Sequence, residues 1–176
     1  MSLVPDRRAA NVLLVEDEQV DVALTREGFR RVNHPIHLHY VATGEACLAF
    51  LKKEGNYARA PRPDLILLDL NMPVVDGVEV MQAVLADDRL RTIPVVVLAT
   101  ADTESPIRKM YDLRCSSYIV KPIDAERFMQ VIQMVGEYWF GVVTLPTEHP
   151  GTAGQTAGET CTKSDRAENP FAAPDS

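Results

Sequence analysis

Charged and hydroxyl side chains follow four short apolar runs of this sequence, at the point where each run ends. The runs NVLLV and DLILL lead into carboxylates, first Glu16 with Asp17 and then Asp69. The run IPVVVLA leads into Thr100, and the run SSYIV leads into Lys121. Three carboxylates, a hydroxyl and an ammonium group can together bind a cation and a phosphoryl group, provided that folding brings them to one place.

The chemistry of such a set depends on its members lying close together. Crowded carboxylates repel one another and raise each other's pKa unless a cation joins them. Mg²⁺ suits oxygen ligands of this kind and is usually held by one or two carboxylates, water and a phosphate oxygen. With the ion and Lys121 offsetting the charge on the transferred oxygens, Asp69 can act as a nucleophile toward a phosphoryl group.

The elements that would position these side chains are short strands buried on both faces. Continuous runs of Val, Ile and Leu, without period-two alternation, are typical of strands inside a parallel sheet. A fifth run alternates more strongly between apolar and polar residues. The predicted strands cover residues 11–16, 36–42, 64–69, 93–99 and 116–121.

Between the strands, apolar residues recur at helical spacing. Asp76 is the expected N-cap of the third helix, and Asp124 the expected start of the fifth. A strand followed by a helix, repeated five times, predicts a doubly wound α/β domain with a five-stranded parallel sheet. Such sheets bind ligands at the carboxyl ends of their strands, where the charged side chains stand. The predicted helices cover residues 18–32, 44–54, 76–86, 103–113 and 124–140.

Composition restricts the class of protein. The 176 residues suit one domain, and a net charge of −7 with a pI near 5.1 disfavours a nucleic-acid partner. No apolar run approaches the roughly 18 residues of a membrane span. Three cysteines without a CxxC pair predict reduced thiols and a cytoplasmic protein. We expect an N-terminal extension over 1–9, one domain over 10–142, and a mostly disordered C-terminal extension over 143–176.

Each of these features alone has a simpler interpretation. Asp17 could cap the following helix, Lys121 could begin an ordinary turn, and Asp69 could be a loop residue. Their joint occurrence at strand ends favours a functional site instead. His37 and His39 would point the same way from a strand, but without a third ligand nearby a solvated strand face is the preferred interpretation.

Four motifs stand in order along the chain: LLVEDE, DLILLDLNMPVVDG, VVVLATA and YIVKP. Together they resemble the receiver domain of two-component response regulators, over about residues 10–142. The set of motifs is far more specific than any one of them. The resemblance implies the flavodoxin-like topology, with the five strands in the order 2-1-3-4-5.

The resemblance also implies a role for each residue that matches the family's phosphorylation site. Asp69 is the phospho-accepting aspartate, and Glu16 and Asp17 hold Mg²⁺ together with it. The backbone carbonyl of Asn71 completes the metal site.

Further positions match the parts that respond to phosphorylation. Thr100 is the switch hydroxyl that binds a phosphoryl oxygen, with the small Ala101 beside it. Tyr118 is the aromatic switch, which turns into space that Thr100 vacates, and Lys121 pairs with the phosphate. In this family a cis bond joins Lys121 to Pro122, against a rate of about 5–6% for X-Pro bonds in general.

A narrower likeness indicates the partners. The segments 55–73, 93–102 and 137–146 resemble single-domain regulators that partner phytochrome-type sensor histidine kinases, including bacteriophytochromes. In that group the segment after the last helix supports a homodimer through the face of the fourth helix, fifth strand and fifth helix. The three aromatic residues of EYWF cannot all face the core of one helix. Either one or two of them mark an interface, or residues 141–146 cover all three.

These features predict a phospho-acceptor signalling protein that receives a phosphoryl group from a sensor histidine kinase onto Asp69. It would signal through protein contacts or relay the phosphate, with only Mg²⁺-dependent phosphotransfer and autodephosphorylation as its own chemistry.

One alternative is a Mg²⁺-dependent phosphatase with an aspartyl nucleophile, although such enzymes place a second acid where this chain has Asn71. Another is a degenerate receiver scaffold, although every functional position carries an active-type residue. A nucleotide- or flavin-binding fold is disfavoured because the first strand-to-helix turn, VEDEQVD, has no glycine.

Overall fold

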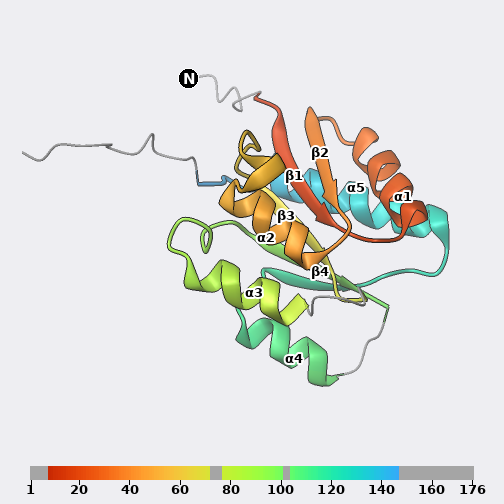
Figure 1. Cartoon of the computed structure of the whole chain (residues 1–176). Helices are drawn as coiled ribbons and strands as arrows, with labels where there is room; N and C mark the ends of the chain where they lie inside the picture. Colours follow the sequence, from red (N-terminus) through yellow and green to blue (C-terminus); the bar gives the residue numbers. More distant parts are fainter. Residues whose placement is uncertain (1–7, 72–76, 101–103, 147–176) are drawn as a thin grey trace, which may run out of the picture. The chain divides into compact units, whose positions relative to one another are not determined.

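Five parallel strands form a single sheet with helices on both faces (Figure 1), in a computed structural model that describes residues 8–71, 77–100 and 104–146. The order across the sheet is β2-β1-β3-β4-β5, which confirms the predicted topology. The strands are β1 (Ala10–Val15), β2 (Ile36–Val41), β3 (Leu65–Asp69), β4 (Val95–Ala99) and β5 (Ser117–Val120).

Each predicted helix is present, with its ends shifted by a few residues. Thr43 caps α2 by accepting a hydrogen bond from the backbone N–H of Ala46, and Asp124 caps α5 by accepting one from Arg127. Asp76, the expected cap of α3, lies outside the described residues. The helices are α1 (Gln19–Arg30), α2 (Gly44–Lys52), α3 (Gly77–Ala86), α4 (Glu104–Asp112) and α5 (Ala125–Gly141), with an additional 3₁₀ turn at Gly55–Tyr57.

Two apolar layers, one on each face of the sheet, bury the central strands. Leu13 and Val15 of β1 pack toward α2 and α3, whereas Val12 and Leu14 pack toward α1 and α5 (Figure 1). Every residue of β3 and β4 is buried, which confirms that the continuous apolar runs are strands covered on both faces. Burying each Val, Leu or Ile side chain contributes about 1.5–3 kcal/mol, so these strands are held firmly in place.

The register of the strands brings their carboxyl ends to one edge of the sheet. Val15 of β1 lies opposite Leu68 of β3, and Ala99 of β4 lies opposite Val120 of β5. The residues that follow these pairs therefore leave the sheet side by side. This arrangement places Glu16, Asp17, Asp69, Thr100 and Lys121 at one edge.

At this edge the structure rules out the alternative of a helix cap by Asp17, and the expectation of a cis bond before Pro122 is wrong. The N-cap of α1 is Glu18, whose side chain makes no cap hydrogen bond, so Asp17 does not cap the helix. The carboxylate of Glu16 instead accepts a hydrogen bond from the backbone N–H of Glu18 at 3.0 Å. No cis peptide bond occurs among the described residues, so the bond between Lys121 and Pro122 is trans, the intrinsically favoured form.

The described helices include none that is long and apolar enough to cross a membrane. The predicted extensions fall mostly outside the described residues, since residues 1–7 and 147–176 are not among them.

Candidate functional site

Three carboxylates meet where β1 and β3 end. Glu16 and Asp17 follow β1, and Asp69 is the last residue of β3. One carboxylate oxygen from each residue lies within 4.8 Å of the others. Glu16 and Asp69 are each 1% exposed, and Asp17 is half-buried, so most of this negative charge is removed from water. The sequence predicts that these three carboxylates meet, and the structure brings them together.

The cluster has the chemistry of a site for a hard divalent cation. Burial raises the pKa of Glu16 to about 7, and the hydrogen bond between Glu16 and Asp69 adds to this effect. A cation would offset the repulsion between the three carboxylates, and their clustered oxygens suit Mg²⁺ or a similar ion. The residues present therefore fit the predicted metal. The contribution of the Asn71 carbonyl stays a prediction.

Lys121 reaches into the same cluster from the end of β5. Its Nζ donates hydrogen bonds of 2.8 Å to Glu16, to Asp69 and to Asp21. The lysine side chain is only 7% exposed. Burial alone would lower the pKa of Lys121, but the bonds to the three carboxylates raise it above its ordinary value. Lys121 is thus a buried ammonium group held against the predicted phospho-acceptor.

Asp21 is a member of the site that the strand-end pattern of the sequence does not indicate. It lies in the first turn of α1, and its Oδ2 accepts the bond from Lys121. The signal in the sequence was its spacing, because position 21 follows Asp17 by one helical turn. Side chains in a helix tilt toward its N-terminus, which aims Asp21 back at the edge where Asp17 stands.

Thr100 joins the site through Asn71. The Thr100 hydroxyl donates a hydrogen bond of 3.1 Å to the Asn71 side-chain oxygen. The backbone N–H of Asn71 in turn donates to Asp69 Oδ1 at 2.9 Å. The hydroxyl of Thr100, the expected switch, is therefore linked to Asp69 through Asn71. Thr100 and Asn71 are both exposed. Ala101, expected beside it, lies outside the described residues.

Tyr118 stands apart from the carboxylates. It is half-buried and packs against the apolar layer that β3 and β4 share with α2 and α3. Its backbone N–H donates a hydrogen bond of 3.4 Å to the hydroxyl of Tyr111 in α4. The structure thus places Tyr118 in β5, beside Tyr111 of α4, and its role as a switch stays a prediction.

The histidines do not add a metal site. His39 Nε2 lies 3.1 Å from Asn11 Oδ1, and its ring packs at a tilt against Phe50. Within the described ranges, the only group of three or more His, Cys, Asp or Glu residues able to hold an ion is the acidic one.

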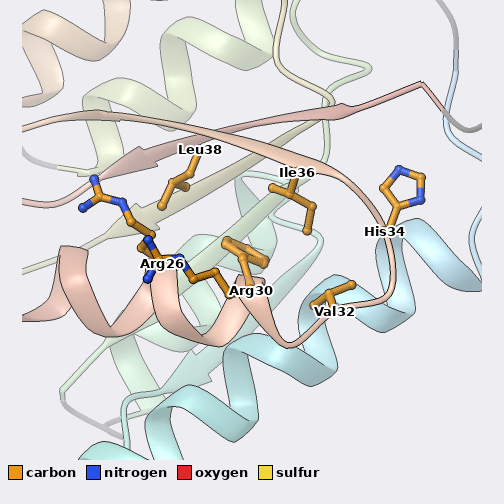
Figure 2. Close-up of a pocket in the computed structure, with 7 residues that line it drawn as sticks. Arg26, Arg30, Val32, His34, Ile36 and Leu38 are labelled. Carbon is orange, nitrogen blue, oxygen red and sulfur yellow. The ribbon is translucent and has the colours of Figure 1, made fainter.

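A surface groove of about 300 Å³ lies between α1 and β2 (Figure 2). Arg26 and Arg30 stand along its α1 side, and Ile36 and Leu38 form part of its β2 side. No carboxylate lines it, so the groove does not repeat the chemistry of the acidic cluster.

Comparison with known proteins agrees with this geometry. Residues 12–133 match the response regulator receiver domain family. The response regulator Rcp1 of Synechocystis sp. is 37% identical over 135 residues, which cover 77% of this chain and 92% of Rcp1.

Solved structures share the fold over almost their whole length. The Mn²⁺-bound form of Rcp1 is 36% identical with a TM-score of 0.75, covering 78% of this chain and 99% of that one. The phosphorylated cyanobacterial phytochrome response regulator RcpA is 39% identical with a TM-score of 0.77, covering 80% and 100%. The bacteriophytochrome response regulator RtBRR is 33% identical with a TM-score of 0.64, covering 82% and 86%. The motifs, the strand order and these similarities lead to one conclusion: the chain is a response regulator and belongs to the receiver domain family of two-component signalling.

Proposed function

We propose that Asp69 accepts a phosphoryl group from a sensor histidine kinase, in a reaction that requires Mg²⁺. The observation that carries this proposal is the setting of Asp69, which is buried, clustered with Glu16 and Asp17, and bonded to Lys121 at 2.8 Å. The residues 10–142 form the receiver domain of this proposal, and residues 1–9 and 143–176 are its extensions.

The transfer exchanges one bond to phosphorus for another. A carboxylate oxygen of Asp69 bonds to the phosphorus while the bond to the imidazole nitrogen of the kinase histidine breaks, and that nitrogen keeps the electron pair. Glu16, Asp17, Asp69 and the Asn71 carbonyl would hold the ion. When bound, the ion offsets the negative charge of the phosphoryl oxygens. Lys121, which bonds to Glu16 and Asp69, supplies a second positive charge.

The response to phosphorylation would begin at Thr100. A phosphoryl group on Asp69 adds about two negative charges and strong acceptor oxygens. The Thr100 hydroxyl would leave Asn71 for one of these oxygens, and Tyr118 would turn into the vacated space. Because the Tyr118 backbone is bonded to Tyr111, the change would reach the surface of α4 and β5.

A phytochrome-type kinase is the partner that the relatives support. RcpA and RtBRR are phytochrome and bacteriophytochrome response regulators by name, and they are 39% and 33% identical to this chain. We place the protein in the cytoplasm, where the free cysteines Cys47 and Cys115 would stay reduced. No direct contact with nucleic acid or membrane is part of this proposal.

A homodimer through α4, β5 and α5 is the proposed assembly. Tyr111 in α4, Val120 in β5 and Tyr138 in α5 are large apolar or aromatic side chains that are exposed to solvent. Trp139 and Phe140, in contrast, pack partly buried against the core, so Tyr138 is the residue of EYWF that supports the interface.

The proposal excludes an enzyme that acts on an external substrate. A phosphatase with an aspartyl nucleophile needs an acid to protonate the leaving group, and the matching position holds Asn71. Its side-chain oxygen accepts a hydrogen bond from Thr100, and an amide cannot serve as that acid.

Mass spectrometry after treatment with acetyl phosphate and Mg²⁺ tests the proposal. The protein should gain one phosphoryl group that is stable to acid and labile to base, and EDTA should prevent the reaction. Asp69→Asn should abolish the adduct, because an amide oxygen is not the required nucleophile. Labelling that persists in this variant would refute the assignment of Asp69.

A further inference from the structure

A carboxylate outside the proposed metal site holds the lysine of that site. Lys121 has three carboxylate partners at 2.8 Å, of which Glu16 and Asp69 belong to the acidic cluster. The third, Asp21, does not. When a cation and a phosphoryl group engage Glu16 and Asp69, Asp21 is the partner that stays available to Lys121.

We propose that Asp21 is a positioning residue for phosphoryl transfer, anchoring the Lys121 ammonium group at the pocket through the reaction. The inference rests on the proposed phosphorylation of Asp69 and deepens it. Asp21 itself touches neither the expected cation nor the phosphoryl group, so it acts through Lys121.

The distance that Lys121 spans explains why an anchor is useful. Lys121 follows β5, whereas Glu16 and Asp21 follow β1, and β3 and β4 lie between those strands. The lysine therefore contacts carboxylates from an element that is not a neighbour of β5 in the sheet. A long, flexible stem has many rotamers, so a fixed partner at its far end limits the directions in which the ammonium group can point.

Asp21 is well placed to be that fixed partner. It lies in the first turn of α1, a regular helix of 12 residues, where a negative charge is favoured by the helix dipole. Its side chain is 28% exposed, against 1% for Glu16, so it lies closer to solvent than the buried carboxylates of the cluster. An ammonium group has three N–H donors. With one donor held by Asp21, the remaining donors are directed toward Asp69 and, after transfer, toward its phosphoryl group.

The first experiment compares two variants that each remove one negative charge near the start of α1. In Asp21→Ala the anchor is lost, whereas Glu18→Ala is the matched control, because Glu18 is exposed and its side chain makes no cap bond. At saturating acetyl phosphate and Mg²⁺, Asp21→Ala should be phosphorylated about 10-fold more slowly than the unmodified protein, a loss typical of supporting contacts. Glu18→Ala should react at the unmodified rate, and circular dichroism should show that both variants are folded at the assay temperature.

The second experiment asks whether Asp21 acts through Lys121. In a Lys121→Ala background, Asp21→Ala should cause no further loss of rate, since the group that it positions is gone. The ¹⁵Nζ NMR signal of the Lys121 ammonium group gives a readout independent of reactivity. Without any metal, the ammonium protons should exchange with water faster in Asp21→Ala, where Lys121 has lost one of its three partners, than in the unmodified protein and in Glu18→Ala.

The outcomes separate this inference from the proposed function. An unmodified rate in Asp21→Ala, or an equal loss in the presence and absence of Lys121, would overturn the role of Asp21 while leaving Asp69 as the acceptor. If the unmodified protein were not labelled at Asp69, the proposed function itself would fail.

Discussion

Asn71 connects Asp69 to Thr100, through its backbone on one side and its side chain on the other. Its backbone N–H donates to the carboxylate of Asp69, and its side-chain oxygen accepts from the hydroxyl of Thr100. Before phosphorylation, Thr100 is therefore occupied by a neutral acceptor. A phosphoryl oxygen is a charged acceptor and forms the stronger hydrogen bond, which gives Thr100 a physical reason to change partners.

Replacing Thr100 tests this exchange. Thr100→Ala should still gain a phosphoryl group on Asp69, because the nucleophile, the carboxylates and Lys121 are intact. The shift of the Tyr118 backbone amide signal on phosphorylation, measured by NMR, should fall to a small fraction of its normal size. Thr92→Ala is the control, because Thr92 is exposed and its hydroxyl contacts Arg62 on a different part of the surface. A full Tyr118 response in Thr100→Ala would contradict the proposed coupling.

Among the described elements, α1 and α5 pack directly against each other. Both contribute to the apolar layer that also contains Val12 and Leu14 of β1. The close approach depends on glycine. A Cβ added at Gly28 would lie 2.8 Å from the Cβ of Ile132, and one added at Gly136 would lie 2.7 Å from Val32 Cγ2. This packing seats α1, and with it Asp21, against the sheet.

Adding a methyl group at this contact should destabilise the fold. We expect Gly28→Ala to lower the free energy of unfolding by about 1–3 kcal/mol, since the added Cβ would also meet the carbonyl oxygen of Met129. Urea unfolding followed by circular dichroism measures the change. Gly141→Ala in α5 is the control, because nothing lies within 4 Å of a Cβ there, and it should unfold at the same urea concentration or higher. Equal midpoints for Gly28→Ala and the unmodified protein would show that the helices can move apart without cost.

At the scale of the whole molecule, α4 and α5 each carry large side chains that are exposed to solvent. Met134 and Tyr138 of α5 are 65% and 54% exposed, and Tyr111 of α4 is 49% exposed. Water contact at such large side chains is unfavourable, so a second copy of the chain that covered them would gain stability.

A charge placed on this surface should prevent the proposed homodimer. Tyr138→Glu should shift the protein to a monomer in sedimentation velocity runs at micromolar concentrations, with and without phosphorylation, because the dimer would bury the carboxylate. Leu85→Glu on α3 serves as the control, since Leu85 is 41% exposed and lies outside α4, β5 and α5. A Tyr138→Glu variant that sediments as a dimer would contradict the proposed interface.

The sequence by itself determined the sheet and the meeting of the carboxylates. Continuous apolar runs identify strands buried on both faces, and parallel strands must end at a common edge. Glu16, Asp17, Asp69 and Lys121 could be placed together for that reason, before any side-chain position was known. Local spacing was enough because each of these residues directly follows a strand or ends one.

Only the tertiary structure decided the contacts that depend on side-chain reach and direction. The bond of Lys121 to Asp21 spans the ends of two strands, and the bond of Thr100 to Asn71 joins two loops. The closeness of α1 and α5 at Gly28 depends on how two helices pack, which the spacing within either helix does not specify. These features arise from distances between elements that are far apart along the chain, and a pattern of neighbouring residues contains no information about such distances.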